Sequence, residues 1–325
     1  MRRGATAAFA PVAFATVVVA GGLLSGCAAA PSQVGTAAIV GDTTVSLESV
    51  QDWFDRVVAD RERKERARAS EQLDDIGRKV VTEAVRHALL LQVAQREKLD
   101  IDEERVNELL DELGGPAQAV EALAKTPGTE WLLYDETTIR ERVRDQLIAL
   151  ELARKYYDST EIRFDATQAE NRNQALDKAN RIASDPDGVD EIIQADIAGG
   201  LQAFANEKLS VAADPSTAAH SPLFAVPAGT VVVYAAGGQG GWWVIYIGER
   251  DSDAPRDNSP NVVEEGSVDQ SLMSAIGFRM MAALMADTEV ELNPRYGVWE
   301  QVSLEATQTD GERLVTTVSV EQPDS

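Results

Sequence analysis

The chain has 325 residues, a length sufficient for two domains with hydrophobic cores of their own. Its 54 acidic and 30 basic residues give a formal net charge of −24, which argues against nucleic acid as a partner because like charges repel. One cysteine and two histidines exclude a disulfide framework and leave no residues for a zinc cluster or a Cys–His nucleophile pair. No sequence motif indicates a cofactor, so we expect neither a metal nor a cofactor.

Residues 1–26 have the three parts of a secretory signal peptide. Two arginines follow Met1, residues 4–22 carry no charge, and small residues then lead to Cys27. The sequence Leu24-Ser25-Gly26-Cys27 has the form of a lipobox, in which the cysteine thiol receives a diacylglyceryl group. The alternative is a transmembrane helix with an incidental cysteine, since the apolar run is close to the roughly 20 residues that span a bilayer.

The signal peptide is favoured because no positive stop-transfer cluster follows the apolar run. We expect cleavage before Cys27, lipid attachment to its thiol, and a tether over residues 27–36. Two acyl chains hold a protein stably on a bilayer, whereas one does so only marginally. The predicted location is therefore the extracytoplasmic face of the cell membrane, which the protein contacts through its lipid anchor.

Residues 37–157 are predicted to form a helical domain that opens with a β-hairpin. Two β-rich runs flank Gly41 and Asp42, and Ser46 is suited to cap the first helix. His87 lies on a later helix, and we expect it to be a structural residue rather than a metal ligand. Apolar residues at helical spacing predict helices at about residues 47–57, 73–98, 102–113, from 116 onward, and 135–157.

Residues 160–250 are predicted to form a small α/β domain. The expected elements are a strand at 161–165, helices at 167–183 and 189–197, a loop-rich passage at 199–222, and strands at 230–234 and 242–247. The glycine-rich stretch between the last two strands lacks the lysine and the Ser/Thr of a phosphate-binding loop. It is therefore interpreted as a hairpin connection.

The rest of the chain is predicted to return to the helical domain. Residues 251–267 have the composition of a linker, residues 268–306 are expected to supply a helix and a strand that pack on the helical domain, and residues 307–325 are predicted to be a loose tail. Four methionines would be adaptable contact surfaces for client polypeptides if exposed, and the alternative is ordinary core packing. These candidates are Met273, Met280, Met281 and Met285.

This order of elements resembles the SurA/PrsA-type extracytoplasmic foldases, in the form found among actinobacterial lipoproteins. Residues 37–50 look like the opening hairpin and first helix of that family, and residues 99–106 are similar to the start of its next helix. Residues 227–233 and 240–250 resemble the closing hairpin of a parvulin domain. The resemblance implies an α+β fold, in which a mainly α-helical SurA-like domain is completed by a C-terminal helix and carries an inserted parvulin-like α/β domain.

Active parvulins place one histidine at the end of the first strand of the domain and a second in its last strand. In this sequence the first position falls at residues 163–166, without a histidine, and Trp243 fills the second. An indole keeps the bulk of an imidazole but loses its acceptor nitrogen. Trp242 and Trp243 are thus candidates for a degenerate parvulin pocket. No catalytic residue is assigned, and we expect no strong prolyl isomerase activity.

The predicted function is a membrane-anchored chaperone or foldase that holds unfolded or newly exported polypeptides. Two alternatives stay open: an active peptidyl-prolyl cis-trans isomerase, and a non-enzymatic envelope scaffold or regulator that docks a single partner. A Ser-His-Asp triad built on His87 or His220 also stays open, although the sequence has no Gly-X-Ser-X-Gly elbow.

Overall fold

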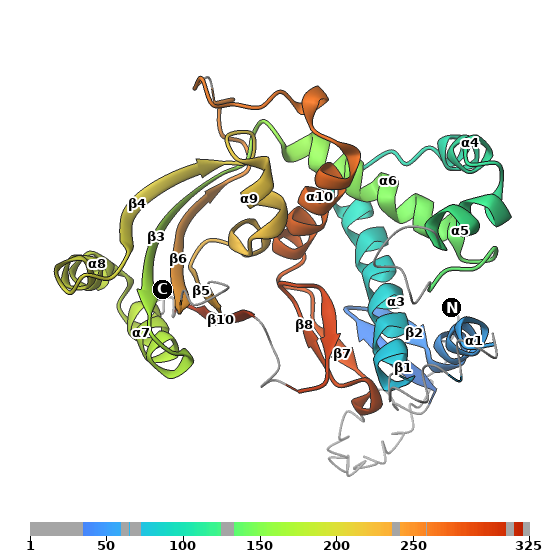
Figure 1. The fold of residues 1–325 in the computed structure, drawn as a ribbon, viewed down its shortest axis with the longest axis horizontal. Helices are drawn as coiled ribbons and strands as arrows, with labels where there is room; N and C mark the ends of the chain where they lie inside the picture. Colours follow the sequence, from blue (N-terminus) through green and yellow to red (C-terminus); the bar gives the residue numbers. More distant parts are fainter. Residues whose placement is uncertain are drawn as a thin grey trace, which may run out of the picture. The chain divides into compact units, whose positions relative to one another are not determined.

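The structure, a computed structural model of the chain, describes residues 35–59, 65, 73–124, 133–235, 241–257, 259–309 and 315–320. The predicted signal peptide, Cys27 and most of the predicted tether lie outside these residues. Gln33–Ser325 form one compact unit, in which helices and antiparallel sheets give the α+β fold that the sequence predicts (Figure 1). The helical region and the sheet region described below are parts of this unit.

The helical region opens with the predicted β-hairpin. β1 (Thr36–Val40) pairs with β2 (Thr43–Ser46), and the chain reverses at Gly41, whose φ of 53° favours glycine. β7 (Val290–Leu292) pairs with the other edge of β1 and completes the order β2-β1-β7. The chain therefore returns to its first strand from a point far along the sequence, as Figure 1 shows.

Helices follow the hairpin in chain order: α1 (Leu47–Val57), α3 (Leu73–Arg96), α4 (Glu103–Glu112), α5 (Pro116–Ala124) and α6 (Ile139–Tyr156). The side chain of Ser46 caps α1 by accepting a hydrogen bond from the amide of Ser49, which confirms the predicted helix start. Asp102 caps α4 in the same way through the amide of Glu104.

α10 (Gln270–Leu284) packs against α6, and the two helices approach closely at Gly277. A Cβ atom at this position would lie 1.9 Å from the carbonyl oxygen of Ala149 on α6, so only glycine fits there. The predicted completion of the helical region by a C-terminal helix is therefore confirmed.

The four methionines proposed as a client-contacting surface are buried in the core. Their exposed fractions lie between 0% and 4%. α10 is apolar around most of its circumference because it packs against both the helical region and the sheet region. The interpretation as a contact surface is wrong and the alternative, core packing, is confirmed for Met273, Met280, Met281 and Met285.

The sheet region contains an antiparallel sheet of order β10-β5-β6-β3-β4. Its strands are β3 (Glu161–Ala169), β4 (Ala203–Ser210), β5 (Thr230–Ala235), β6 (Trp242–Asp251) and β10 (Val315–Ser319). α7 (Arg172–Ser184) and α8 (Val189–Ala198) cover one face, and α9 (Pro215–His220) lies on the other. On β5, Val231 and Val233 pack toward α7 and α8, whereas Val232 joins the opposite core.

Shorter elements complete the described chain. They are the single 3-10 turns η1 (Pro186–Gly188), η2 (Leu223–Ala225), η3 (Glu265–Ser267) and η4 (Pro294–Tyr296), and the strand pair β8 (Val298–Glu300) and β9 (Glu305–Thr307).

Two segments predicted to be irregular form regular structure. β4 and α9 lie in the passage predicted to be loop-rich, and β10 lies in the predicted loose tail. β10 pairs with β5 at every residue, from Val315 with Tyr234 to Ser319 with Thr230. These predictions are wrong because the hydrogen-bonding edges of β3 and β5 stabilise partner strands that are mainly polar in sequence.

Candidate functional site

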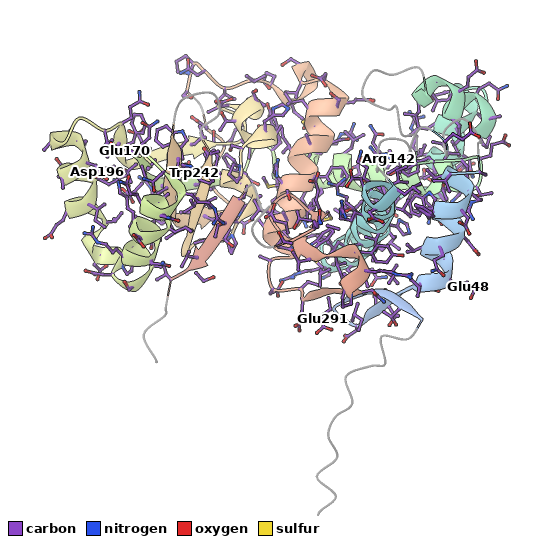
Figure 2. All side chains as sticks on the ribbon, turned by 60° about the horizontal axis from the view of Figure 1, so that its bottom comes forward. Glu48, Arg142, Glu170, Asp196, Trp242 and Glu291 are labelled. Atoms are coloured by element: carbon purple, nitrogen blue, oxygen red, sulfur yellow. The ribbon has the colours of Figure 1, made fainter. Side chains whose placement is uncertain are left out.

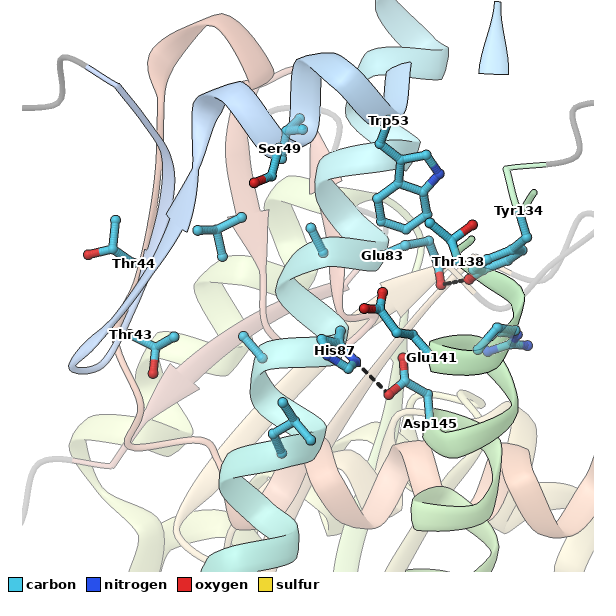
Figure 3. Close-up of a pocket in the computed structure, with 16 residues that line it drawn as sticks. Thr43, Thr44, Ser49, Trp53, Glu83, His87, Tyr134, Thr138, Glu141 and Asp145 are labelled. Carbon is cyan, nitrogen blue, oxygen red and sulfur yellow. Dashed lines mark hydrogen bonds and ion pairs between the residues drawn. The ribbon is translucent and has the colours of Figure 1, made fainter. Parts of the chain in front are cut away.

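A cavity of about 270 Å³ opens in the helical region, between β2, α1, α3, α6 and the segment that precedes α6 (Figure 3). Each of these elements contributes side chains to the lining. The lining residues are Thr43, Thr44, Val45, Ser49, Val50, Trp53, Glu83, Ala84, His87, Ala88, Leu91, Tyr134, Thr138, Glu141, Arg142 and Asp145. They divide into an apolar wall and a polar wall.

The apolar wall comes from β2, α1 and α3, and it consists of Val45, Val50, Trp53, Ala84, Ala88 and Leu91. Leu91 belongs to it and remains 37% exposed although its side chain is large and apolar. The indole N–H of Trp53 donates a hydrogen bond to the carbonyl oxygen of Leu133. The ring of Trp53 also contacts that of Tyr134, with 5.9 Å between centroids and a tilt of 51°. The hydrogen bond and the ring contact together fix the indole beside the cavity.

The polar wall is built by two helices that each present ionisable groups four residues apart. α3 presents Glu83 and His87, and α6 presents Glu141 and Asp145. Residues at this spacing lie on one face of a helix, so both pairs reach the same cavity. Nδ1 of His87 lies 2.7 Å from Oδ1 of the buried Asp145, and this contact links the two helices (Figure 3).

The two glutamates of the lining differ in their partners. Glu83 forms an ion pair with Arg86 at 2.8 Å and accepts a hydrogen bond from the hydroxyl of Tyr134. Glu141 is exposed and has no hydrogen bond or ion pair with any residue that the structure describes. Arg142 places its guanidinium carbon 5.6 Å from the centroid of the Tyr134 ring, a cation–π contact.

Contact between His87 and Asp145 affects the protonation of both. The hydrogen bond to Asp145 raises the pKa of His87, because a carboxylate stabilises the imidazolium form. Burial raises the pKa of Asp145, and the hydrogen bond to His87 offsets only part of that effect. Burial and the nearby Glu83 also raise the pKa of Tyr134, so its hydroxyl stays protonated and donates to Glu83.

The geometry does not form the catalytic triad that the sequence left open. Ser49 lines the same cavity as His87, but Figure 3 shows it on α1, and no hydrogen bond joins the two in the described structure. His220 lies exposed on α9, where its Nδ1 is 3.0 Å from the carbonyl oxygen of Ser216. Neither histidine is therefore joined to a serine side chain by a hydrogen bond within the described residues.

The tryptophans predicted to mark a degenerate parvulin pocket lie on opposite faces of the sheet. Trp243 packs toward the larger core and stacks on Phe204, with 6.1 Å between ring centroids. Trp242 packs with the apolar side chains of α7 and α8, in the part of the sheet region that carries Glu170 and Asp196 (Figure 2). Neighbouring residues of a strand alternate between faces, so the two indoles do not line one pocket.

The cavity was not predicted from the sequence, although the spacing of its ionisable residues is visible there. Glu83 precedes His87 by four residues, and Glu141 precedes Asp145 by the same spacing. Each pair is visible in the sequence, but their approach depends on the packing of α3 against α6.

Among the described residues, no group of three or more histidine, cysteine, aspartate or glutamate side chains is arranged to hold a metal ion. In the same part of the chain, every helix is too short or too polar to cross a membrane.

Comparison with known families finds a match in the N-terminal part of the chain. Residues 1–114 match a family model described as the SurA-like N-terminal domain. This segment is similar to that domain. It supplies β2, α1 and α3, whereas Tyr134, Glu141 and Asp145 lie beyond the match. The cavity is thus built jointly by the segment that matches the SurA-like N-terminal domain and by the segment that follows it.

Two solved structures are similar to this chain, both at 11% sequence identity. The foldase protein PrsA from Lactococcus lactis aligns over 79% of this chain and 94% of its own, with a TM-score of 0.26. A chain from the SurA-like chaperones PEB4 and Cj1289 of Campylobacter jejuni aligns over 80% of this chain and 99% of its own, with a TM-score of 0.21. The comparison with curated proteins found no match.

Proposed function

We propose that this protein is an extracytoplasmic, lipid-anchored chaperone that holds unfolded or newly exported polypeptides. The observation that carries the proposal is the match to the SurA-like N-terminal domain at residues 1–114, to which α10 and β7 return from the C-terminal part of the chain. The sequence resemblance to SurA/PrsA-type foldases connects this arrangement with exported clients. The cavity gives the helical region a site that a side chain of a client could enter, which supports the proposal.

The proposed location rests on the sequence of the first 27 residues. A basic start, an uncharged run and a lipobox that ends at Cys27 support export followed by lipidation. Mass spectrometry of the protein from a membrane fraction is expected to find a diacylglyceryl group on an N-terminal cysteine. An unmodified mature start, or a Cys27→Ala variant that stays fully membrane-bound, would contradict the anchor.

The proposal also includes the absence of strong prolyl isomerase activity. Neither of the two histidines of the chain lies on β3 or β6, where the parvulin resemblance would require them. The uncatalysed barrier to prolyl isomerisation is about 18–20 kcal/mol, and lowering it requires a pocket that weakens the double-bond character of the amide. Trp243 offers an apolar face but no acceptor nitrogen.

Two assays on the soluble chain from Gln33 onward test the proposal together. The chain is expected to suppress the aggregation of chemically denatured citrate synthase when the two proteins are mixed in equal amounts. It is expected to leave unchanged the slow refolding phase of a protein whose folding is limited by a prolyl bond. Unhindered aggregation would contradict the chaperone function, and a rate enhancement comparable to that of a parvulin would establish the isomerase alternative.

In-cell crosslinking distinguishes a chaperone from a scaffold. A chaperone is expected to trap many different exported chains. Repeated capture of one or two folded partners would favour the envelope scaffold instead.

A further inference from the structure

The cavity of the helical region is large enough to admit one long side chain of a bound polypeptide. At about 270 Å³ it lies below the roughly 300–1,000 Å³ that is typical of small-molecule sites. We propose that it binds the side chain of one lysine or arginine of a bound polypeptide. The inference rests on the proposed chaperone function, since it specifies which client segments that function would select.

The apolar wall matches the stem of such a side chain. Val45, Ala88 and Leu91 offer aliphatic surface from β2 and α3. Lysine and arginine carry three or four methylene groups that pack on apolar surface while the charged end stays with polar groups. Burial of the stem against Leu91 would also cover a side chain that is now 37% exposed.

Charge decides which end group the cavity accepts. The lining has three carboxylates, on Glu83, Glu141 and Asp145, against the single guanidinium of Arg142, so its formal charge is −2 while His87 is neutral. Protonation of His87 changes the formal charge of the lining to −1, and a negative charge still favours a cation. At longer range, the net charge of −24 on the whole chain attracts basic segments of a client.

Glu141 is the carboxylate available to form a new ion pair. Glu83 already binds Arg86 and Tyr134, and Asp145 already binds His87. Glu141 has no such partner within the described residues, and it lies one turn before Asp145 on the same face of α6.

The aromatic pair adds a second preference for a cation. Trp53 and Tyr134 both line the cavity, and their rings are in contact. The guanidinium of Arg142 already lies over Tyr134, so the protein itself shows that a cation is stable against this ring. A neutral aromatic occupant would instead shield Glu141 from water without giving it a partner, which is unfavourable.

The experiment uses short capped peptides as probes of the soluble chain from Gln33 onward. Acetyl-Gly-Arg-Gly-amide and its lysine counterpart are titrated while the indole N–H resonance of Trp53, assigned with a Trp53→Phe variant, is followed by NMR. Both probes are expected to shift this resonance saturably. The citrulline peptide, which keeps the shape of arginine without its charge, is expected to bind about tenfold more weakly.

A matched pair of variants separates the cavity from general electrostatics. Glu141→Gln is expected to weaken binding of the arginine peptide by about threefold to fivefold. Glu151→Gln removes one negative charge from the same helix at a site outside the cavity, and it is expected to leave binding unchanged. Equal effects of the two substitutions, equal binding of the citrulline or a tyrosine peptide, or no binding by any probe would overturn the proposal.

Aggregation assays on the same proteins distinguish this inference from the proposed function. If the arginine peptide binds at Trp53 but the chain does not suppress aggregation, the chaperone function fails and the basic side-chain site remains. If the chain suppresses aggregation while no peptide perturbs Trp53, the site fails and the chaperone function remains.

Discussion

One buried charged group in the sheet region and one in the helical region find their partners in different ways. In the sheet region, Arg250 on β6 donates hydrogen bonds to the carbonyl oxygens of Phe224 at 3.1 Å and Val226 at 3.5 Å, and burial lowers its pKa to about 10. In the helical region, His87 and Asp145 pair with each other beside a cavity. The first group is enclosed by backbone acceptors, whereas the second pair lies where a ligand or water can reach it.

The difference separates two roles for enclosed charges. Backbone acceptors around Arg250 connect β6 to the segment before β5, and its guanidinium also contacts the sulfur of Met280 on α10. Such an arginine holds elements of the fold together. The His87–Asp145 pair lines a cavity instead, so a ligand that enters the cavity can contact it.

Replacement of Arg250 by alanine is expected to have the largest effect on stability. The carbonyl oxygens of Phe224 and Val226 would lose their charged donor, so we expect the free energy of unfolding to fall by about 2 kcal/mol. Urea unfolding followed by circular dichroism measures this change. Arg163→Ala is the control, because Arg163 is 41% exposed and its partners, Glu249 and Asn206, lie at the surface. A similar loss in both variants would show that Arg250 has no special structural role.

Replacement of Asp145 by alanine is expected to cost less, about 1 kcal/mol. Burial already disfavours the charged carboxyl, and water from the cavity can hydrate His87 once its partner is removed. The same urea titration gives the value. A loss greater than that of Arg250→Ala would reverse the comparison between the two regions.

The smallest expected effect is a dependence of stability on pH that arises from His87. The folded-state pKa of His87 is raised, so its stabilising contribution is fully present below about 6.5, the ordinary histidine value, and is lost as the pH rises through the raised value. The pKa of Asp145 is also raised, so its contribution has the same sign. Urea midpoints are therefore expected to fall between pH 6 and pH 9, and to fall less in His87→Gln. An identical pH profile in both proteins would contradict the pairing.

Local sequence signals determined how much of the fold could be predicted. The hairpin around Gly41, the cap at Ser46 and the long helices depend on neighbours a few residues away, so periodicity and turn chemistry suffice. β4 and β10 depend on edges supplied by distant strands, and their polar sequences give no signal of that pairing. The methionines of α10 could be assigned to the core only once their helix was seen to contact both regions.

The same limit applies to the site. The spacing of Glu83 and His87, and that of Glu141 and Asp145, can be found in the sequence. The distance of 2.7 Å between His87 and Asp145 depends on how α3 and α6 pack, which no single segment encodes. Trp242 and Trp243 are neighbours in the sequence and were predicted to mark one pocket. They lie on different faces of the sheet, because neighbouring residues of a strand point in opposite directions.

The pairing of β7 with β1 constrains the order of assembly. Ala38 pairs with Leu292, so the first strand of the fold cannot acquire its second neighbour until nearly all of the polypeptide is present. The antiparallel core of β3, β4, β5 and β6 lies within residues 161–251 and involves much shorter loop closures. The middle of this chain can therefore organise early, while the module that begins first is completed last.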